Sequence, residues 1–207
     1  MARSLIPSTD FFRRDPLPCA RELIGMELVH ERCRGTILET EAYRETGDPA
    51  CHLFTRPSAR AFASRYEPGT AYVYLNYGVH WLVNVLCREE ATGEAGFVLF
   101  RALEAVAGLE QMVERRGTDD PRRLCSGPGK LTAALGIDGS FHGRSLIAEP
   151  GFCLLHASRP AGLEVIADRR IGISAGQELE WRFLAKDHPG VSVKASGGGN
   201  RSDRKPI

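Results

Sequence analysis

One stretch of alternating residues, Ile37-Leu38-Glu39-Thr40-Glu41-Ala42-Tyr43, places two carboxylates inside a mostly apolar run. Successive side chains of a β-strand point to opposite faces, so Ile37, Glu39, Glu41 and Tyr43 would share one face. Carboxylates seldom occupy such a run unless they are ion-paired or take part in chemistry. The pattern therefore predicts a strand that carries either a buried ion pair or a reactive acidic site.

Strand patterns outnumber helical ones and mostly follow one another directly, which favours an α+β class with a largely antiparallel sheet. The predicted strands cover 26–30, 36–43, 71–75, 79–86, 97–103, 152–155, 163–167, 180–184 and 191–193, and the predicted helices cover 16–24, 109–116 and 127–136. The Pro- and Gly-rich segment 44–69 shows little periodicity and is interpreted as a long loop.

A chain of 207 residues is expected to form one compact domain, here residues 1–194, with a curved sheet flanked by helices. The Gly-rich, basic segment 195–207 is expected to be a disordered tail. Asn76-Tyr77-Gly78 joins two alternating runs, which indicates a protruding hairpin with an aromatic residue at its tip. An exposed aromatic wedge needs a partner surface, and a gap between stacked bases is one such surface.

Composition narrows the class of protein. No apolar run reaches the roughly 18 residues that span a membrane, and no signal peptide is apparent, so a cytoplasmic location without membrane contact is expected. The six cysteines show no metal-ligand spacing, so reduced thiols and no structural zinc are expected. The net charge of +1 argues weakly against bulk electrostatic binding of nucleic acid, although clustered arginines allow a basic face.

The paired acidic residues allow two interpretations. Glu41, with Glu39 beside it, could act as a general base or acid, or both could be buried partners of Arg101. His52 could hold a water molecule beside a carboxylate or could be an ordinary surface histidine. Together with His80 these groups could form a metal site, but their spacing matches no known ligand pattern.

Aromatic and amide side chains suggest a pocket for flat rings. Tyr43 and Tyr74 are candidates for stacking, whereas Tyr72 on a strand is more typical of a core residue. Asn84 lies among apolar neighbours on its strand, so its amide must find hydrogen bonds from the structure or from a ligand. The segment 125–130, Cys-Ser-Gly-Pro-Gly-Lys, lacks the full Walker A pattern, and Lys130 could either contact one phosphate or belong to an ordinary helix cap.

Taken together, these motifs resemble the alkyladenine (3-methyladenine) DNA glycosylase family of base-excision repair. The similarity extends from about residue 13 to residue 193, and the segments occur in family order: Leu38–Tyr43, Ala50–His52, Gly69–Tyr74 with Tyr77-Gly78, Asn84, Leu99–Glu104 and Leu124–Leu131. The resemblance implies a monomeric enzyme that needs no metal or other cofactor. It would flip a damaged purine out of duplex DNA and hydrolyse its N-glycosidic bond.

The resemblance also implies a role for each matching residue. Glu41 would activate the water and Arg101 would help to hold it, while His52 would position the flipped nucleotide. Tyr43 and Tyr74, together with His52, would sandwich the extruded base. The remaining expectations are Tyr77 filling the gap in the DNA stack, Asn84 filtering out normal purines and Lys130 contacting the backbone.

Two other functions remain open at this level. One is a module on a related fold that binds nucleic acid without catalysing a reaction. The other is a metal-dependent hydrolase that uses Glu39, Glu41, His52 and His80. No lysine is close to Glu41 in the sequence motif, which favours hydrolysis over a Schiff-base reaction.

Overall fold

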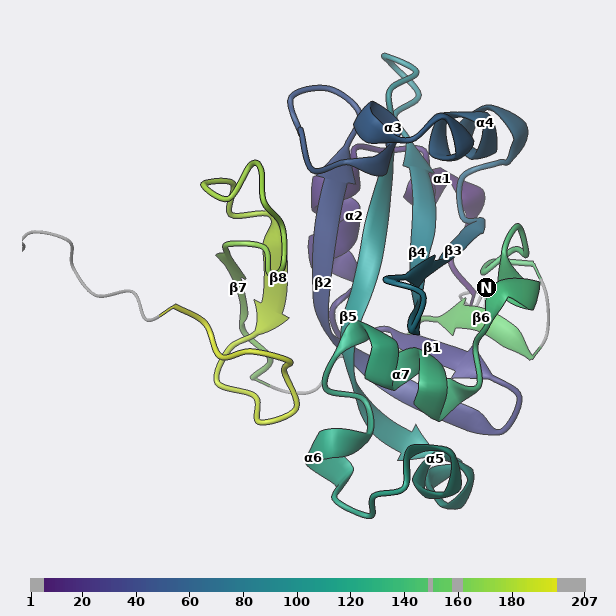
Figure 1. Cartoon of the computed structure of the whole chain (residues 1–207), viewed down its shortest axis with the longest axis vertical. Helices are drawn as coiled ribbons and strands as arrows, with labels where there is room; N and C mark the ends of the chain where they lie inside the picture. The colour runs from purple at the N-terminus through teal and green to yellow at the C-terminus, as the bar shows by residue number, and fades with distance from the viewer. Residues whose placement is uncertain (1–5, 149–150, 158–161, 197–207) are drawn as a thin grey trace, which may run out of the picture.

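The computed structural model describes residues 6–148, 151–157 and 162–196, and its centre is a curled antiparallel sheet (Figure 1). The strand order is β3-β4-β5-β2-β1-β6, and β7 and β8 are added beside β2. The strands are β1 (Glu27–His30), β2 (Cys33–Arg44), β3 (Ala71–Asn76), β4 (His80–Arg88), β5 (Ala95–Ala107), β6 (Phe152–Leu155), β7 (Val165–Asp168) and β8 (Arg182–Ala185). The predicted α+β class and antiparallel sheet are confirmed.

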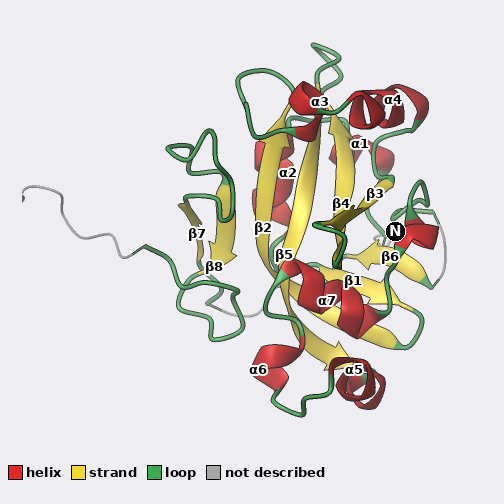
Figure 2. Ribbon diagram, in the orientation of Figure 1, coloured by secondary structure: helices red, strands yellow, loops and turns green. Residues whose placement is uncertain are grey.

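Helices surround the sheet, with α3 and α4 at one end of its long strands and α5 and α6 at the other (Figure 2). The helices are α1 (Thr9–Phe12), α2 (Pro16–Leu23), α3 (His52–Thr55), α4 (Pro57–Arg65), α5 (Leu109–Arg116), α6 (Pro121–Leu124) and α7 (Pro128–Leu135), and a 3-10 turn follows at Gly139–Phe141. In the described part of the chain, no helix has the length and apolar content that crossing a membrane would require.

Strand β2 is the central element of the site because it has neighbours on both edges. It pairs with β5 along its length, with β1 at its beginning and with β8 at residues 39–41. Glu39 and Glu41 therefore lie in the interior of the sheet, where water is excluded, and neither side chain is exposed. Charged groups in such a place need partners of opposite charge.

Two irregularities between β2 and β5 change the simple alternation predicted from Ile37 onward. The register shifts between Ile37 and Glu39, which leaves Leu38 without an opposing residue. It shifts again between Glu39 and Thr40, which leaves Arg101 of β5 unopposed. Bulges of this kind re-aim side chains and are common next to functional sites. Here the second shift turns Arg101 toward the two carboxylates, which it contacts together.

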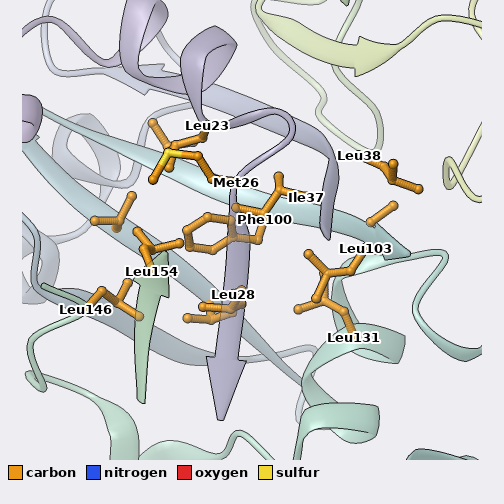
Figure 3. Packing of buried hydrophobic residues seen from close by; sticks show 14 of the residues in the cluster. Leu23, Met26, Leu28, Ile37, Leu38, Phe100, Leu103, Leu131, Leu146 and Leu154 are labelled. Carbon is orange, nitrogen blue, oxygen red and sulfur yellow. The ribbon is translucent and has the colours of Figure 1, made fainter. Parts of the chain in front are cut away.

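The main core lies between the sheet and α2, and it continues under α7 (Figure 3). Leu23, Met26, Ile37 and Phe100 are among its labelled members. A second apolar cluster lies beneath α3 and α4 and joins Phe62 and Leu53 to the sheet residues Tyr72 and Phe97. Because Tyr43 and Tyr74 pack against this second cluster, it supports the aromatic side of the site.

The clearest helix predictions are confirmed, together with their end signals. Asp15 caps α2 by accepting a hydrogen bond from the Leu17 amide (2.7 Å). α5 ends at Gly117, which adopts the left-handed conformation that glycine tolerates. The six cysteines are all free and buried, as their scattered positions indicated.

Two local predictions are wrong. The segment 44–69 is not a loop throughout, because α3 and α4 form within it. Pro57 occupies the first turn of α4, where proline is tolerated, and the buried residues Ala59, Phe62 and Ala63 follow at helical spacing. Residues 191–193 are bent and not a strand. Their backbone groups bond to side chains, namely Ser192 N–H to Glu39 and the Val193 carbonyl to Arg182.

The predicted disordered tail can be compared with the structure only in part. Residues 195 and 196 are described, and the amide of Ser196 donates to Asp168 (2.8 Å). Residues 197–207 lie outside the described residues.

Candidate active site

A cavity of about 500 Å³ opens between the hairpin β3–β4, the segment around α3 and the loop that follows β7. Six residues that the sequence marked as functional line it: Tyr43, His52, Tyr74, Tyr77, Asn84 and Arg101. The cavity is also lined by Ile171, Gly172 and Ile173 from the loop after β7. Pockets of roughly 300–1,000 Å³ with apolar walls and a few polar groups are typical of small-molecule sites.

Glu41 lies directly behind the wall of this cavity and is completely buried. One of its oxygens, Oε2, accepts hydrogen bonds from the Tyr43 hydroxyl (2.7 Å) and from Arg101 (3.2 Å). The other, Oε1, accepts from the backbone amide of Ile171 (2.7 Å). All three partners are donors and all three line the cavity, so the carboxylate is fixed at the cavity wall as an acceptor.

Arg101 joins the two carboxylates that the sequence placed on one strand. Its Nε donates to Glu39 (3.1 Å) and its Nη1 donates to Glu41 (3.2 Å). Burial lowers the pKa of Arg101, but the charges of Glu41 and Glu39 more than reverse this effect, so the net shift is upward. The ion-paired interpretation of Glu39 and Glu41 is therefore correct, and Arg101, which joins them, also lines the cavity.

A second buried ion pair supports Tyr43. Arg170 makes two hydrogen bonds to Asp48 (2.6 and 2.7 Å), and its guanidinium lies 4.7 Å from the centre of the Tyr43 ring. Because Arg170 precedes Ile171 in the chain, this pair also fixes the amide that bonds Glu41. Burial, followed by the charge of Glu41, raises the pKa of Tyr43 well above its usual value, so its hydroxyl remains protonated and donates.

His52 and Tyr74 form a second group of rings that lines the cavity. Their ring centres are 4.6 Å apart, and the Tyr72 hydroxyl is 3.4 Å from Nδ1 of His52. Burial, with a smaller effect of the Arg56 charge, lowers the pKa of His52 to about 4. Burial also raises the pKa of Tyr74 to about 12. Both side chains are therefore uncharged near neutral pH.

The other predicted site residues, Asn84, Tyr77 and Lys130, lie at different distances from the cavity. Asn84 is buried at its wall and donates from Nδ2 to the Tyr72 carbonyl (3.1 Å). Tyr77, in the turn between β3 and β4, is 90% exposed and has a positive φ of 50°. Lys130 is exposed on α7 and does not line the cavity, although Pro128 from the same turn does.

Comparison with known proteins agrees with this arrangement of motifs. A family model described as methylpurine-DNA glycosylase matches residues 10–189. The chain belongs to the methylpurine-DNA glycosylase family.

Individual relatives in this family cover most of the chain. A protein of Rhodopseudomonas palustris (strain ATCC BAA-98 / CGA009) is 46% identical over 177 residues, which cover 86% of this chain and 83% of the relative. A protein of Salinibacter ruber is 43% identical over 203 residues, covering 91% and 97%, respectively. One of Chlorobaculum tepidum is 39% identical over 198 residues, covering 89% and 93%. All three carry provisional names as 3-methyladenine DNA glycosylases.

The low pKa of His52 gives this member of the methylpurine-DNA glycosylase family a specific pH dependence of stability. An unfolded histidine binds a proton below about pH 6.5, whereas folded His52 does so only below about 4. The unfolded state therefore binds more protons between these values, and folding stability is lost as the pH falls through this window. We expect wild type to lose more stability between pH 7 and pH 5 than His52→Gln does. Urea unfolding at both values measures this, and equal losses would contradict the buried neutral imidazole.

The hypothesised metal ligands are not brought together in this family member. Among the residues that the structure describes, no group of three or more His, Cys, Asp or Glu side chains is placed to hold a metal ion. The oxygens of Glu39 and Glu41 accept hydrogen bonds from arginine, tyrosine, serine and backbone donors. His80, the fourth proposed ligand, is exposed at the start of β4.

Sequence reasoning missed several groups that complete the site in this family member. Asp48, Arg170 and Arg182 are charged residues in segments without a recognisable motif, so their burial was not apparent. The amide of Ile171 acts through the backbone and leaves no signature in the sequence. Every buried carboxylate needs a cation, and this rule could have identified the two arginines as candidate partners. It could not have shown which arginine pairs with which carboxylate.

Proposed function

We propose that this chain is a monofunctional DNA glycosylase that removes alkylated or deaminated purines from duplex DNA. Membership of the methylpurine-DNA glycosylase family and the names of the relatives support a DNA glycosylase that acts on alkylated bases. The observation that carries the proposal is a buried, hydrogen-bonded carboxylate, Glu41, at the wall of a cavity bounded by the aromatic rings of Tyr43 and Tyr74.

The proposed reaction begins with extrusion of the damaged nucleotide from the duplex. A base inside the stack cannot be reached by a group at the bottom of a cavity, so it must be flipped out at a cost of a few kcal/mol. Tyr43 would stack on one face of the base, and Tyr74 with His52 would contact the other. The exposed Tyr77 would occupy the gap in the DNA and so oppose return of the base.

Hydrolysis would then use a water molecule activated by Glu41. A carboxylate offers about four acceptor positions, and the three hydrogen bonds to Glu41 leave one, on Oε1, for the water proton. As the bond from the base to C1′ breaks, the sugar gains oxocarbenium character, which the negative charge of Glu41 stabilises. The water oxygen bonds to C1′, its proton passes to Glu41, and the base leaves with the bonding electron pair.

Other residues would adjust this reaction rather than perform it. Arg101 would orient the water as well, a role supported by its position at the cavity and its hydrogen bond to Glu41. Asn84, buried at the cavity wall, would select against normal purines through the polar group that it presents. Lys130 at the beginning of α7 is placed on the surface, where it could contact one backbone phosphate.

Tyr77→Ala is expected to weaken binding to a duplex with one hypoxanthine by about 1–3 kcal/mol, the usual value of one base–aromatic stack. Stability should not change, because the side chain is 90% exposed. Fluorescence anisotropy measures the affinity, and Leu109→Ala, which removes another exposed apolar side chain, is the control. Unchanged affinity of Tyr77→Ala would count against insertion of this ring.

The substrate class can be tested with the full-length chain and four duplexes. Three of the duplexes contain a single damaged base, which is hypoxanthine, ethenoadenine or 7-methylguanine, and the fourth contains only normal bases. Chromatography of the supernatant identifies any base that is released. Release of one or more damaged purines, with none from the normal duplex, is the expected result. Tight binding to lesion duplexes without release from any of them would instead indicate a binding module.

A further inference from the structure

The segment that follows β8 contacts Glu39, one of the two carboxylates of β2, although the family match ends at residue 189. Gly190 packs against β2, where a Cβ at this position would be 2.8 Å from the Cδ1 end of the Leu38 side chain. Two residues later, the Ser192 amide donates to Oε2 of Glu39 (2.6 Å). The C-terminal segment 190–196 therefore contacts the buried ionic groups directly.

The hydroxyl of Ser192 bonds to both Glu39 and Arg101, which are also bonded to each other. It donates to Oε1 of Glu39 (2.9 Å) and accepts from Nη2 of Arg101 (3.3 Å). Each nitrogen of the Arg101 guanidinium consequently has its own partner: Nε bonds Glu39, Nη1 bonds Glu41 and Nη2 bonds Ser192. A planar guanidinium held at three points has a single orientation, in which Nη1 is directed at Glu41.

The segment is also held independently of this hydroxyl. Arg182 donates to the Val193 carbonyl (2.9 Å), and the Ser196 amide donates to Asp168 (2.8 Å). Together with the amide of Ser192, these bonds use backbone atoms only on the C-terminal segment. Substitution of the Ser192 side chain can therefore remove the link to Arg101 while the segment remains docked.

We propose that Ser192 is a positioning residue for the glycosylase reaction: its hydroxyl, shared between Glu39 and Arg101, orients Arg101 toward Glu41 and the attacking water. Ser192 then supports the active site from outside the cavity, and Glu39 acts as the second support of the same guanidinium. This proposal rests on the proposed function, because the effect is exerted through the general base.

Ser192→Ala tests the proposal, with Ser192→Thr as the variant that keeps the hydroxyl. Single-turnover release of hypoxanthine should be about tenfold slower in Ser192→Ala and near wild type in Ser192→Thr, since a hydrogen bond to a charged group is lost only in the first. Affinity for the lesion duplex should change by less than about twofold, because Ser192 is not among the described residues that line the cavity. Ser196→Ala is the control, because the bond of Ser196 to Asp168 uses its backbone amide, which the substitution keeps.

Each outcome decides the proposal. A slower chemical step at unchanged affinity and unchanged unfolding midpoint, restored by threonine, supports it. An unchanged rate in Ser192→Ala overturns it, as does a loss of rate that accompanies equal losses of affinity and stability in both variants. If wild type releases no base from any duplex, the proposed function fails first, and this result is distinguishable because the control fails with it.

Discussion

Glu41→Gln is expected to reduce single-turnover base release by about 10²–10⁴-fold, the usual contribution of a general base. Glutamine has almost the same shape as glutamate but cannot take the proton of the attacking water. Its amide would also place donors opposite Tyr43 or Ile171, which now donate to the carboxylate. Release of hypoxanthine under excess enzyme measures the rate, at a temperature where urea unfolding shows the variant to be folded.

The specificity of this effect can be checked with a carboxylate on the neighbouring strand. Glu104 on β5 has a half-exposed side chain, and its ion-pair partner among the described residues is His188 (3.7 Å), so Glu104→Gln should release base at the wild-type rate. Both variants should bind the lesion duplex. A Glu41→Gln enzyme that retains wild-type turnover would remove Glu41 from the role of base.

Asp48→Asn is expected to have the largest effect on folding, a loss of about 3–5 kcal/mol in the free energy of unfolding. The substitution leaves the Arg170 guanidinium buried without its counter-charge. It also weakens the hydrogen bonds that Asp48 accepts from the amides of Arg44 and Ala50. Because whole domains are stable by only about 5–15 kcal/mol, this single change should move the urea midpoint strongly.

A solvent-exposed pair provides the comparison for this buried one. Glu164 and Lys186 are 2.9 Å apart but both are well exposed, so Glu164→Gln should not shift the urea midpoint measurably. Equal midpoints for Asp48→Asn and wild type would show that the Asp48–Arg170 pair does not hold the loop before α3 to the segment that contains Ile171. The support proposed for Tyr43 would then need another origin.

Much of the site could be predicted because its residues belong to regular elements. Alternation along β2 and β3 indicated which side chains share a face, and hairpin geometry indicated that Tyr77 would be exposed. The structure brings Tyr43, Tyr74 and Asn84 to one cavity and confirms that Arg101 pairs with the acidic residues. These relations depend on periods of two residues and on pairing between strands, both of which are local properties of a sequence.

The rest of the site depends on contacts between distant segments. Arg170 is 122 residues from Asp48, and Ser192 is 153 residues from Glu39. No periodicity relates such positions, and the bulge that re-aims Arg101 arises only when β2 and β5 are paired. The helix α4 was missed for a different reason, since Pro57 indicates either a loop or a helix start depending on what packs beneath it.

Product analysis with the wild-type chain in excess EDTA tests most directly whether this chain is a glycosylase that needs no metal. A labelled duplex with one hypoxanthine is incubated, free base is quantified, and the strand is examined before and after treatment with alkali. We expect free hypoxanthine and a strand that remains intact until alkali cleaves the abasic site. Folded protein that binds the duplex but releases no base, or that releases base only when a divalent metal is restored, would contradict this expectation.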